Sequence, residues 1–498
     1  MKRKLTLLFA TVLALLLSGS VIQRTSSVDA ISGATKRSKP KAVSVANTPL
    51  SGGEEQAEPE LVLGDQGFPS DLDPAHADNG RFTLAYGVGE TLVLPDDELK
   101  IRPWLAESWE NIDSLTWNIT LRPSVKYHNG AEMTAKSVKE SLERAIRLSD
   151  EASRLIPSAS IQADGLSLTI RTPEPCPNLM NYLANPAFVI VDTKAAEGKN
   201  FSYFPVCTGP FIPAGFTGNT EIRLQRFEGY HGGVPTIKSA AVRYEADADK
   251  LVNAIKSGGM DAVMNISPET LETLAQQGCF TQHTDGLSSY LLMLNTKHPA
   301  LSVKKVRKAI ALALNPYDPE QAQALLAEAG YSDTDGAELS LRLAVPREEP
   351  GLLEQARKLE ARLEQVGINV AVISYSEVFF TSRARYGKFD LLLFTVNTTE
   401  NGDSQQFYKD FFTLDGKQNY GHYRSEEVES AVHRLENEFD PRERILLAGQ
   451  IRALVTEDAA FLFLGNPQVN SASRQSIAGL AVHPVYGYRL TADTVAGH

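Results

Sequence analysis

Leu99–Gly130, LKIRPWLAESWENIDSLTWNITLRPSVKYHNG, contains all three tryptophans of the chain. Trp104–Ser108 predicts a short apolar helix, and the alternation of apolar side chains over residues 115–121 predicts a half-buried strand. A second strand is expected to end at Asn129-Gly130, a pair that favours a turn because both residues tolerate positive φ. Apolar side chains then recur at helical spacing over residues 131–147. The stretch predicts a mixed α/β core packed around the tryptophans.

The same stretch resembles the extracellular solute-binding proteins of family 5, the peptide- and nickel-binding class that supplies ABC importers. Its three consecutive matching blocks are residues 103–109 (PWLAESW), 121–130 (LRPSVKYHNG) and 133–144 (MTAKSVKESLER). Shorter matches follow at residues 208–211 (TGPF), 227–235 (FEGYHGGVP), 255–265 (IKSGGMDAVMN), 291–296 (LLMLNT) and 306–314 (VRKAIALAL). The resemblance implies an α/β, two-lobed periplasmic-binding-protein-like fold of type II, with the large cluster C architecture and hinge crossovers.

The domain organisation follows partly from the residues and partly from this resemblance. A basic start, an apolar run and small residues predict a signal peptide or signal anchor over residues 1–22. Residues 23–60 are expected to form a disordered tether, because Ile31–Pro59 lacks aromatic side chains and is rich in Ser, Ala, Pro, Lys and Gly. The resemblance implies lobe I over residues 61–265, including an extra subdomain at about 83–207, lobe II over 266–469, and a return to lobe I over 470–498.

The end of the apolar run bears on localisation. Leu17-Ser18-Gly19 is followed by Ser20, where the lipobox of bacterial lipoproteins has the cysteine that carries the lipid. Three outcomes stay open: cleavage near Ser20 or Ala30 with release, an uncleaved signal anchor, or a natural loss of anchoring. We expect an exported protein, periplasmic or at the cell surface.

Composition excludes several classes of function. The 498 residues are enough for two or three domains, and a net charge of −12 argues against nucleic acid as a partner.

The three cysteines leave two readings open. Cys176 and Cys207 could pair in an oxidising compartment and leave Cys279 unpaired, or all three could be small buried thiols. Neither a zinc-ligand pair nor a Gly-x-Ser-x-Gly, His-Glu-x-x-His or Walker motif is present. We expect a monomer without cofactor, resident metal or enzymatic activity.

Candidate ligand contacts follow two predicted strands. Arg347 comes directly after one, Thr399–Asp403 comes after another, and ligands of open α/β lobes sit at the carboxyl ends of strands. The resemblance to dipeptide-binding members implies that Arg347 holds a peptide carboxylate and Glu400 holds the α-ammonium. A zwitterion that leaves water needs an opposite charge at each end. A surface position for Arg347 and turn chemistry for the acids are the alternatives. The same loop adds Asp403, Asn397 and Asn401 as candidates.

Four more candidates come from the resemblance alone. Residues 86–93 (YGVGETLV) resemble a helix at the cleft, which implies Tyr86 and Glu90 as ligand contacts. Arg147 or Arg154 falls near the position where nickel-binding members place an arginine that faces the ligand's carboxylates. Helix packing for Tyr86, a solvated or capping role for Glu90 and a surface position for the arginines are the alternatives.

One departure from the family pattern lies in lobe II. Asn315-Pro316 leads straight into residues 317–322 (YDPEQA), whereas relatives insert several tens of residues here. One wall of that lobe is therefore expected to differ.

These observations predict the extracytoplasmic substrate-binding component of an ABC importer, which captures a small peptide and delivers it to the transmembrane subunits of the permease. A nickel or metal-chelate ligand, carried for example by histidine, is one alternative. A degenerate relative that serves as a receptor or scaffold is another.

Overall fold

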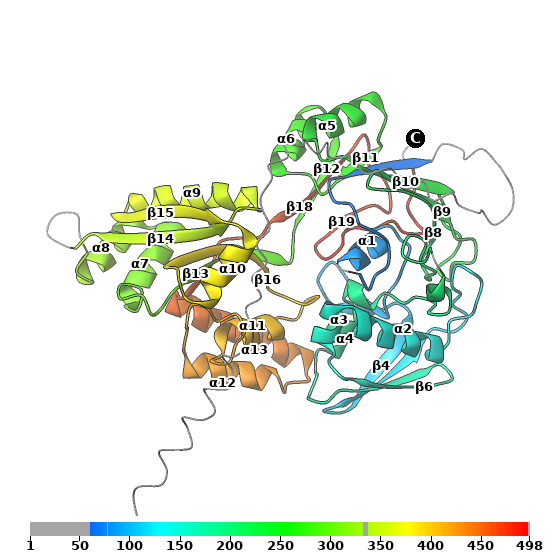
Figure 1. Cartoon of the computed structure of the whole chain (residues 1–498), viewed down its shortest axis with the longest axis horizontal. Helices are drawn as coiled ribbons and strands as arrows, with labels where there is room; N and C mark the ends of the chain where they lie inside the picture. The colour runs from blue at the N-terminus through cyan, green and yellow to red at the C-terminus, as the bar shows by residue number, and fades with distance from the viewer. Residues whose placement is uncertain (1–59, 77, 199, 332–336, 497–498) are drawn as a thin grey trace, which may run out of the picture. The chain divides into compact units, whose positions relative to one another are not determined.

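The computed structural model describes residues 60–76, 78–198, 200–331 and 337–496. The predicted signal segment 1–22 and all but the last residue of the predicted tether 23–60 lie outside these ranges. The described chain forms two α/β lobes, each built on its own sheet (Figure 1). None of the helices in the described ranges combines the length and the hydropathy that a membrane span requires.

The first lobe is built on a seven-stranded sheet in the order β12-β18-β11-β1-β10-β9-β8. Its centre is β1, which runs parallel to both neighbours. The run Leu61-Val62-Leu63-Gly64 predicts this strand from the sequence, and the structure confirms it. The side chains of β11 alternate between two cores: Ala262 and Met264 pack with β1, whereas Val263 packs under α5 and α6. The bounds are β1 Leu61–Asp65, β8 Phe211–Thr217, β9 Glu221–Arg226, β10 Ser239–Tyr244, α5 Ala248–Ser257, β11 Ala262–Met264, α6 Pro268–Gln276, β12 Phe280–Asp285 and β18 Gln468–Ser473.

The tryptophan-rich stretch supplies the first two strands of a four-stranded antiparallel sheet in the order β4-β5-β7-β6. This sheet and helices α2, α3 and α4 form the tryptophan-rich subdomain. Trp117 of β5 is buried and its Nε1 donates a hydrogen bond to the Cys176 carbonyl at 3.1 Å. The predicted strand at 115–121 and helix at 131–147 are confirmed as β5 and α2. The bounds are β4 Ala106–Asp113, β5 Thr116–Leu121, α2 Ala135–Leu148, α3 Asp150–Leu155, β6 Ser160–Asp164, β7 Ser167–Arg171 and α4 Leu179–Leu183.

Three predictions in this half of the chain are wrong. The helix expected at Trp104–Ser108 is the start of strand β4, whose backbone pairs with β5 although most of its side chains are exposed. The strand expected to end at Asn129-Gly130 is reduced to one bridge between Lys126 and Glu132. The apolar run Phe188–Val191 predicts a short strand, but this segment starts in a 3-10 turn, η1 (Pro186–Phe188).

The helix expected over residues 86–93 lies earlier in the chain. It is α1 (Asn79–Ala85), and the chain leaves it through Gly87 at φ +65°, a left-handed conformation that suits glycine. Two short strands follow, β2 (Val93–Pro95) and β3 (Ile101–Pro103).

The second lobe is built on a five-stranded sheet in the order β15-β14-β16-β13-β17. The side chains of β13 alternate between two cores: Leu292 and Leu294 face the core with α7, α8 and α9, whereas Leu291 and Met293 face the core with α10 to α13. Apolar patterning predicts helices over residues 303–314, 352–366, 426–439 and 441–458, and strands over 339–345, 368–375, 389–396 and 460–464. Each is confirmed to within four residues at either end. The bounds are β13 Ser288–Leu294, α7 Lys304–Leu314, α8 Pro319–Glu328, β14 Leu339–Pro346, α9 Pro350–Glu364, β15 Ile368–Tyr375, α10 Glu377–Arg385, β16 Leu391–Asn397, α11 Gln405–Phe412, α12 Glu426–Leu435, α13 Pro441–Asp458 and β17 Phe461–Phe463.

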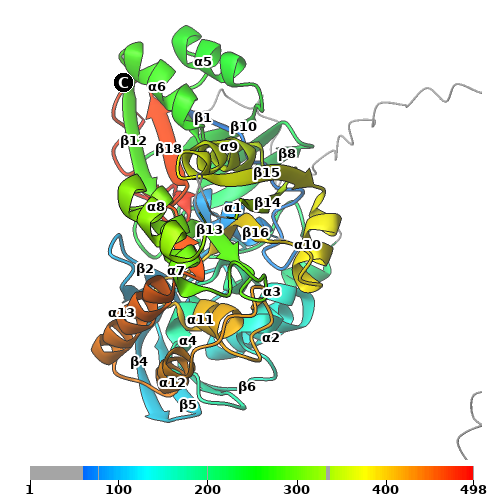
Figure 2. The same cartoon turned by 90° about the vertical axis from the view of Figure 1, so that its left-hand side faces the viewer.

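Two adjacent crossovers join the sheets, one between β12 and β13 and the other between β17 and β18 (Figure 2). They are hydrogen-bonded to each other: Gly286 N donates to the Pro467 carbonyl at 2.9 Å, and Asn466 Nδ2 donates to the Gly286 carbonyl at 2.9 Å. Because α6 and β12 still belong to the first sheet, the chain crosses at Gly286 rather than after residue 265. It returns to the first sheet as β18, which pairs with β11 and β12.

Candidate functional site

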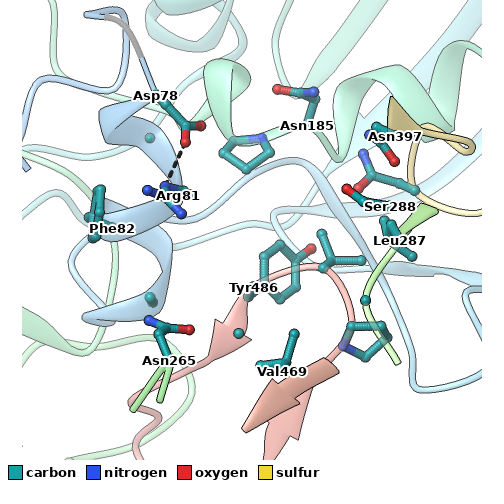
Figure 3. Close-up of a pocket in the computed structure, with 18 of the residues that line it drawn as sticks. Asp78, Arg81, Phe82, Asn185, Asn265, Leu287, Ser288, Asn397, Val469 and Tyr486 are labelled. Carbon is teal, nitrogen blue, oxygen red and sulfur yellow. Dashed lines mark ion pairs between the residues drawn. The ribbon is translucent and has the colours of Figure 1, made fainter. Parts of the chain in front are cut away.

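A cavity of about 710 Å³ lies where the ends of several elements converge (Figure 3). Its walls come from the carboxyl end of β1, from α1, from the turn at 185–187, from both crossovers, from the end of β16 and from residues 484–488. Figure 3 shows Asp78, the N-cap of α1, and Arg81 of α1 on one side and Ser288 and Asn397 on the other. The convergence of strand ends and crossovers at one hollow is typical of ligand sites in α/β proteins.

Acidic side chains predominate in the wall of this cavity. Asp65, Asp78, Glu151 and Glu400 line it, against one basic lining residue, Arg81. Arg81 forms an ion pair with Asp78, with 2.6 Å between Nε and Oδ2. The Arg81 guanidinium also lies over the Phe82 ring, 4.3 Å from its centroid. The cavity therefore favours a ligand that carries a positive group, and Arg81 offers a planar donor fork for a carboxylate.

Glu400 and Arg154, both candidates from the sequence, are in contact. Arg154 Nη2 lies 2.8 Å from Glu400 Oε1 and 2.7 Å from Glu151 Oε1, so one guanidinium bridges two acids of the cavity wall. Burial raises the pKa of Glu400, and the positive charge of Arg154 acts in the opposite direction. Arg154 is thus a second positive group at the site. It contacts two acids of the cavity wall but does not itself line the cavity.

The rest of the Glu400 loop is bound to the tryptophan-rich subdomain. Asn401 Nδ2 donates to the Asn181 carbonyl at 2.8 Å, and Asn181 Nδ2 donates to the Asn401 carbonyl at 2.9 Å. Asp403 is buried and pairs with Arg444 at 2.6 Å, and it accepts a hydrogen bond from Asn178 at 3.0 Å. The charge of Asp403 is therefore neutralised within the protein, and Asp403 is absent from the cavity lining.

Other candidates from the sequence lie away from the cavity. Arg347 is exposed after β14, with Nη2 3.4 Å from the Ser374 carbonyl oxygen. Tyr86 packs in the first-lobe core. Glu90 is fully buried and accepts hydrogen bonds from Tyr230 and His231. Arg147 is exposed in the last turn of α2. The cavity thus brings together Asn397, Glu400 and Asn401, with Arg154 behind them.

Asp65, the last residue of β1, lines the cavity but was not among the candidates predicted from the sequence. Its carboxylate accepts hydrogen bonds from Gly67 N at 2.8 Å, Asn265 Nδ2 at 2.9 Å and Tyr488 OH at 3.0 Å. Burial raises its pKa to about 6, against the effect of these donors. The signal was present in the sequence, because an acid at the carboxyl end of the first strand is a candidate by the rule applied to Arg347 and Glu400.

Tyr486 was missed as well, and no local pattern marks it. Its hydroxyl is buried and has no hydrogen-bond partner among the described residues. Burial raises the pKa of this phenol. Figure 3 shows the ring within the cavity wall. Since buried polar atoms are normally paired, a ligand that accepts or donates here would complete the site.

The disulfide considered for Cys176 and Cys207 is not formed, and all three cysteines are free. Cys176 packs in the core of the tryptophan-rich subdomain, whereas Cys207 packs in the core of the first sheet. Two separate cores hold the two thiols, so they behave as small buried apolar groups.

Fold and cavity define a two-lobed α/β protein with a hollow between its two sheets. The family described as bacterial extracellular solute-binding proteins, family 5 Middle, matches residues 100–316 and 314–419. These matches span more than half of the chain, and the chain belongs to this family. The family and the two-lobed fold class predicted from the sequence are thereby confirmed. The two matches meet at 314–316, where the family's segment is missing from the sequence.

Individual relatives agree with this assignment. The nickel-binding protein NikA of Staphylococcus aureus is 26% identical over 422 residues, covering 78% of this chain and 85% of that protein. The glutathione-binding protein GsiB of Salmonella paratyphi A is 23% identical over 482 residues, covering 84% and 91%. A crystal structure described as a nickel ABC transporter from Bacillus halodurans superposes with a TM-score of 0.77 at 27% identity, covering 88% of this chain and all of that one. These relatives show that the chain is a substrate-binding protein of the ABC importer class.

Proposed function

We propose that the cavity of this protein takes a small peptide with free termini and that the protein delivers it, unaltered, to an ABC permease. The charge distribution of the cavity carries the proposal: four acidic lining residues, one lining arginine, and Arg154 between two of the acids. A peptide is a zwitterion, and its two charges need partners of opposite sign when they leave water.

Each end of the peptide then has a distinct partner. Arg81 receives the carboxylate, because it is the lining cation and its guanidinium forms paired hydrogen bonds with a carboxylate. The α-ammonium lies at Glu400 and Glu151, which share Arg154 but retain further acceptor capacity. Arg81 thus takes the role that the sequence assigned to Arg347. The unpaired Tyr486 hydroxyl supplies one neutral hydrogen bond.

The size and position of the cavity support capture of a small solute. A volume of about 710 Å³ lies within the range of roughly 300–1,000 Å³ that is usual for small-molecule sites. Residues Gly286–Ser288 and Pro467–Val469 of the crossovers line it, so rotation at the crossovers would open and close the site. The ligand is held and released, and no chemical step is required of the lining residues.

A nickel chelate is the second candidate ligand. Similarity to the nickel-binding protein of Staphylococcus aureus and to the Bacillus halodurans protein favours it. Among the described residues, no group of three or more His, Cys, Asp or Glu could hold a metal ion. The chelator, such as histidine, would therefore supply the metal ligands, and Arg81 would contact its carboxylates.

The setting of this function is outside the cytoplasm. The basic start and the apolar run at residues 1–22 favour export, and Ser20 in the lipobox position favours a protein that carries no lipid there. We expect a monomer at the outer face of the membrane, with the transmembrane subunits of an ABC permease as its partner.

Isothermal titration calorimetry tests the ligand. We expect dialanine to bind and Arg81→Ala to weaken it about tenfold to a hundredfold, the value of one or two charge-assisted hydrogen bonds. Arg347→Ala is the matched control, because this exposed arginine lies outside the cavity, and it should bind as the wild type does. If nickel with histidine binds and dialanine does not, the ligand is the metal chelate and not a peptide. Binding of neither would favour a receptor or scaffold.

A further inference from the structure

A second hollow, of about 660 Å³, lies within the second lobe beside helix α10. Its lining includes Phe379, Ser382, Arg383 and Tyr386, and because Ser382 and Arg383 each lie three or four residues from both Phe379 and Tyr386, the four share one face of the helix. α10 packs on strands β14 and β15 and lies at the margin of the view in Figure 2. None of these residues lines the ligand cavity.

The exposed side of α10 carries large apolar side chains. Val378, Phe379 and Tyr386 have exposed fractions of 78%, 67% and 75%. Isolated apolar residues are common on protein surfaces, but three on one nine-residue helix and its C-cap form a patch that needs an explanation.

This patch is surrounded by positive charge in an acidic chain. Four Lys or Arg side chains line the hollow against one acid, Asp390, and that acid is bound by Arg342 through two side-chain hydrogen bonds of 2.9 and 3.0 Å. Arg385 of α10 is exposed nearby. In the described part of the chain, Arg385 and three of the lining cations have no ion-pair partner: Lys297, Arg383 and Lys388.

Two further observations support a positive surface with fixed geometry. Burial lowers the pKa of His422, and Lys297 and Arg424 lower it further, as expected in a positive potential. Arg383 is held in place, with Nη1 3.1 Å from the Lys388 carbonyl and its guanidinium 4.4 Å from the centroid of the Tyr375 ring. The formal charge of the whole chain is −12, so this surface is a local exception.

We propose that α10 and this hollow dock the protein on an anionic lipid membrane. Acidic headgroups would lie at Lys297, Arg385 and Lys388, and Val378, Phe379 and Tyr386 would enter the interface. Exposed apolar and aromatic side chains beside Arg383 and Arg385 of α10 and beside Lys297 and Lys388 form a surface that combines insertion into the headgroup region with attraction to anionic lipids. A free anion would account for the cations but leave the apolar side chains without a role.

Tryptophan fluorescence of the full chain tests this surface separately from any contribution of the N-terminus. Phe379→Trp places a reporter on α10, and Ile445→Trp on α13 is the matched control because Ile445 has a similar exposure, 71%. The emission of the wild-type chain, with its three tryptophans, is subtracted. We expect vesicles of phosphatidylglycerol and phosphatidylcholine to shift the remaining emission of Phe379→Trp to the blue, and vesicles of phosphatidylcholine alone to leave it unchanged. Ile445→Trp should give no shift with either.

The charges are tested in the reporter background. Adding Arg385→Gln and Lys388→Gln should weaken vesicle binding about fivefold for each basic side chain removed, roughly 25-fold together. Lys358→Gln on α9 is the control, because Lys358 lies on another helix and already forms an ion pair with Glu354. This substitution should leave vesicle binding unchanged. Equal shifts for Phe379→Trp and Ile445→Trp, or no shift with anionic vesicles, would overturn the proposal. A shift with inorganic phosphate alone would assign the hollow to a free anion, and one with poly-glutamate but not vesicles would assign it to an acidic protein.

Discussion

Arg154 of helix α3 and Glu400 of the loop after β16 are 246 residues apart in sequence, and their side chains lie 2.8 Å apart. The same guanidinium contacts Glu151, so a single cation neutralises part of an acidic cavity wall. The contact joins the tryptophan-rich subdomain to the second lobe beside the ligand cavity. The protein thus positions its acids with an internal arginine before any ligand enters.

Glu400→Gln should weaken the binding of a peptide with a free amine about tenfold, and should leave the binding of the N-acetylated peptide unchanged. The amide keeps the shape of the side chain but removes the charge that faces the ammonium, and one charge-assisted hydrogen bond contributes about 1.5–3 kcal/mol. Calorimetric titration of dialanine and N-acetyl-dialanine measures the difference. Glu364→Gln on the surface of α9 is the control. An equal loss for both peptides would remove Glu400 from the ammonium site.

Asp403→Asn should destabilise the protein by about 3 kcal/mol without a change of similar size in peptide affinity. The substitution leaves Arg444 buried without its acid, and breaking a buried ion pair from one side typically costs about 3–5 kcal/mol. Urea denaturation followed by circular dichroism measures the loss, and Asp415→Asn at an exposed position is the control. A large drop in affinity with unchanged stability would instead make Asp403 a ligand contact.

Asp65→Asn should remove a pH dependence of stability between about pH 4 and 6. The folded-state pKa of Asp65 is about 6, raised above its ordinary value of 3.8, so the acid favours the folded state at low pH and opposes it once ionised. Ionisation should cost the wild type about 3 kcal/mol of unfolding free energy as the pH rises through this window. Asparagine can still accept from Gly67 and Asn265 and can donate to Tyr488.

Denaturation at a series of pH values measures this effect. The free energy of unfolding of Asp65→Asn, taken relative to that of the wild type, should rise steadily from pH 4 to above pH 6. Above this range the difference between the two should stay constant. Asp97→Asn, at a side chain that is 95% exposed, should follow the wild-type curve. A constant difference between Asp65→Asn and the wild type at every pH would contradict the assignment.

Tyr486→Phe should reduce peptide affinity several-fold and raise stability slightly. The buried hydroxyl has no partner in the described ranges, so its removal relieves a desolvation cost of about 1–3 kcal/mol in the ligand-free protein. In the complex the same change removes a hydrogen bond to the ligand. Thermal unfolding with and without dialanine separates the two effects. If the ligand stabilises the variant as much as it stabilises the wild type, the hydroxyl does not contact the peptide.

Local patterns in the sequence predicted most of the second lobe. Strands such as β15 and helices such as α13 combine clear periodicity with capping residues, here Asp440 and Pro441 at the start of α13. Strands β4 and β12 were missed because most side chains of β4 and half of those of β12 are exposed, and their partners hold them by backbone pairing. Such pairing is a tertiary effect that no local pattern records.

Only part of the candidate site was predicted, because contacts between distant segments of the chain leave no local pattern in the sequence. Glu400, Asn397 and Asn401 were found because they follow a strand whose end reaches the cavity. Arg347 follows the neighbouring strand β14, yet it is exposed and points to the backbone of Ser374. Arg81 and Tyr486 come from a short helix and from the C-terminal segment, and only the packing of the first lobe brings them to the same hollow.

Gly402→Ala should lower both stability and peptide affinity by displacing the wall of the cavity. Gly402 has φ +97°, and an added Cβ would lie 2.5 Å from the Leu99 carbonyl oxygen, so backbone must move. Gly130→Ala is a matched control, because Gly130 has φ +82° but no atom within 4 Å of the added Cβ. Both variants should lose about 1 kcal/mol from backbone strain.

Only Gly402→Ala should also shift the loop that carries Glu400 and Asn401. We therefore expect its dialanine affinity to fall about tenfold in calorimetric titrations, while Gly130→Ala binds as the wild type does. The shift would also weaken the reciprocal hydrogen bonds between Asn181 and Asn401, which amide hydrogen exchange in residues 397–405 would report as faster exchange. Wild-type affinity together with faster exchange would show that the loop supports the lobe contact without forming part of the peptide site.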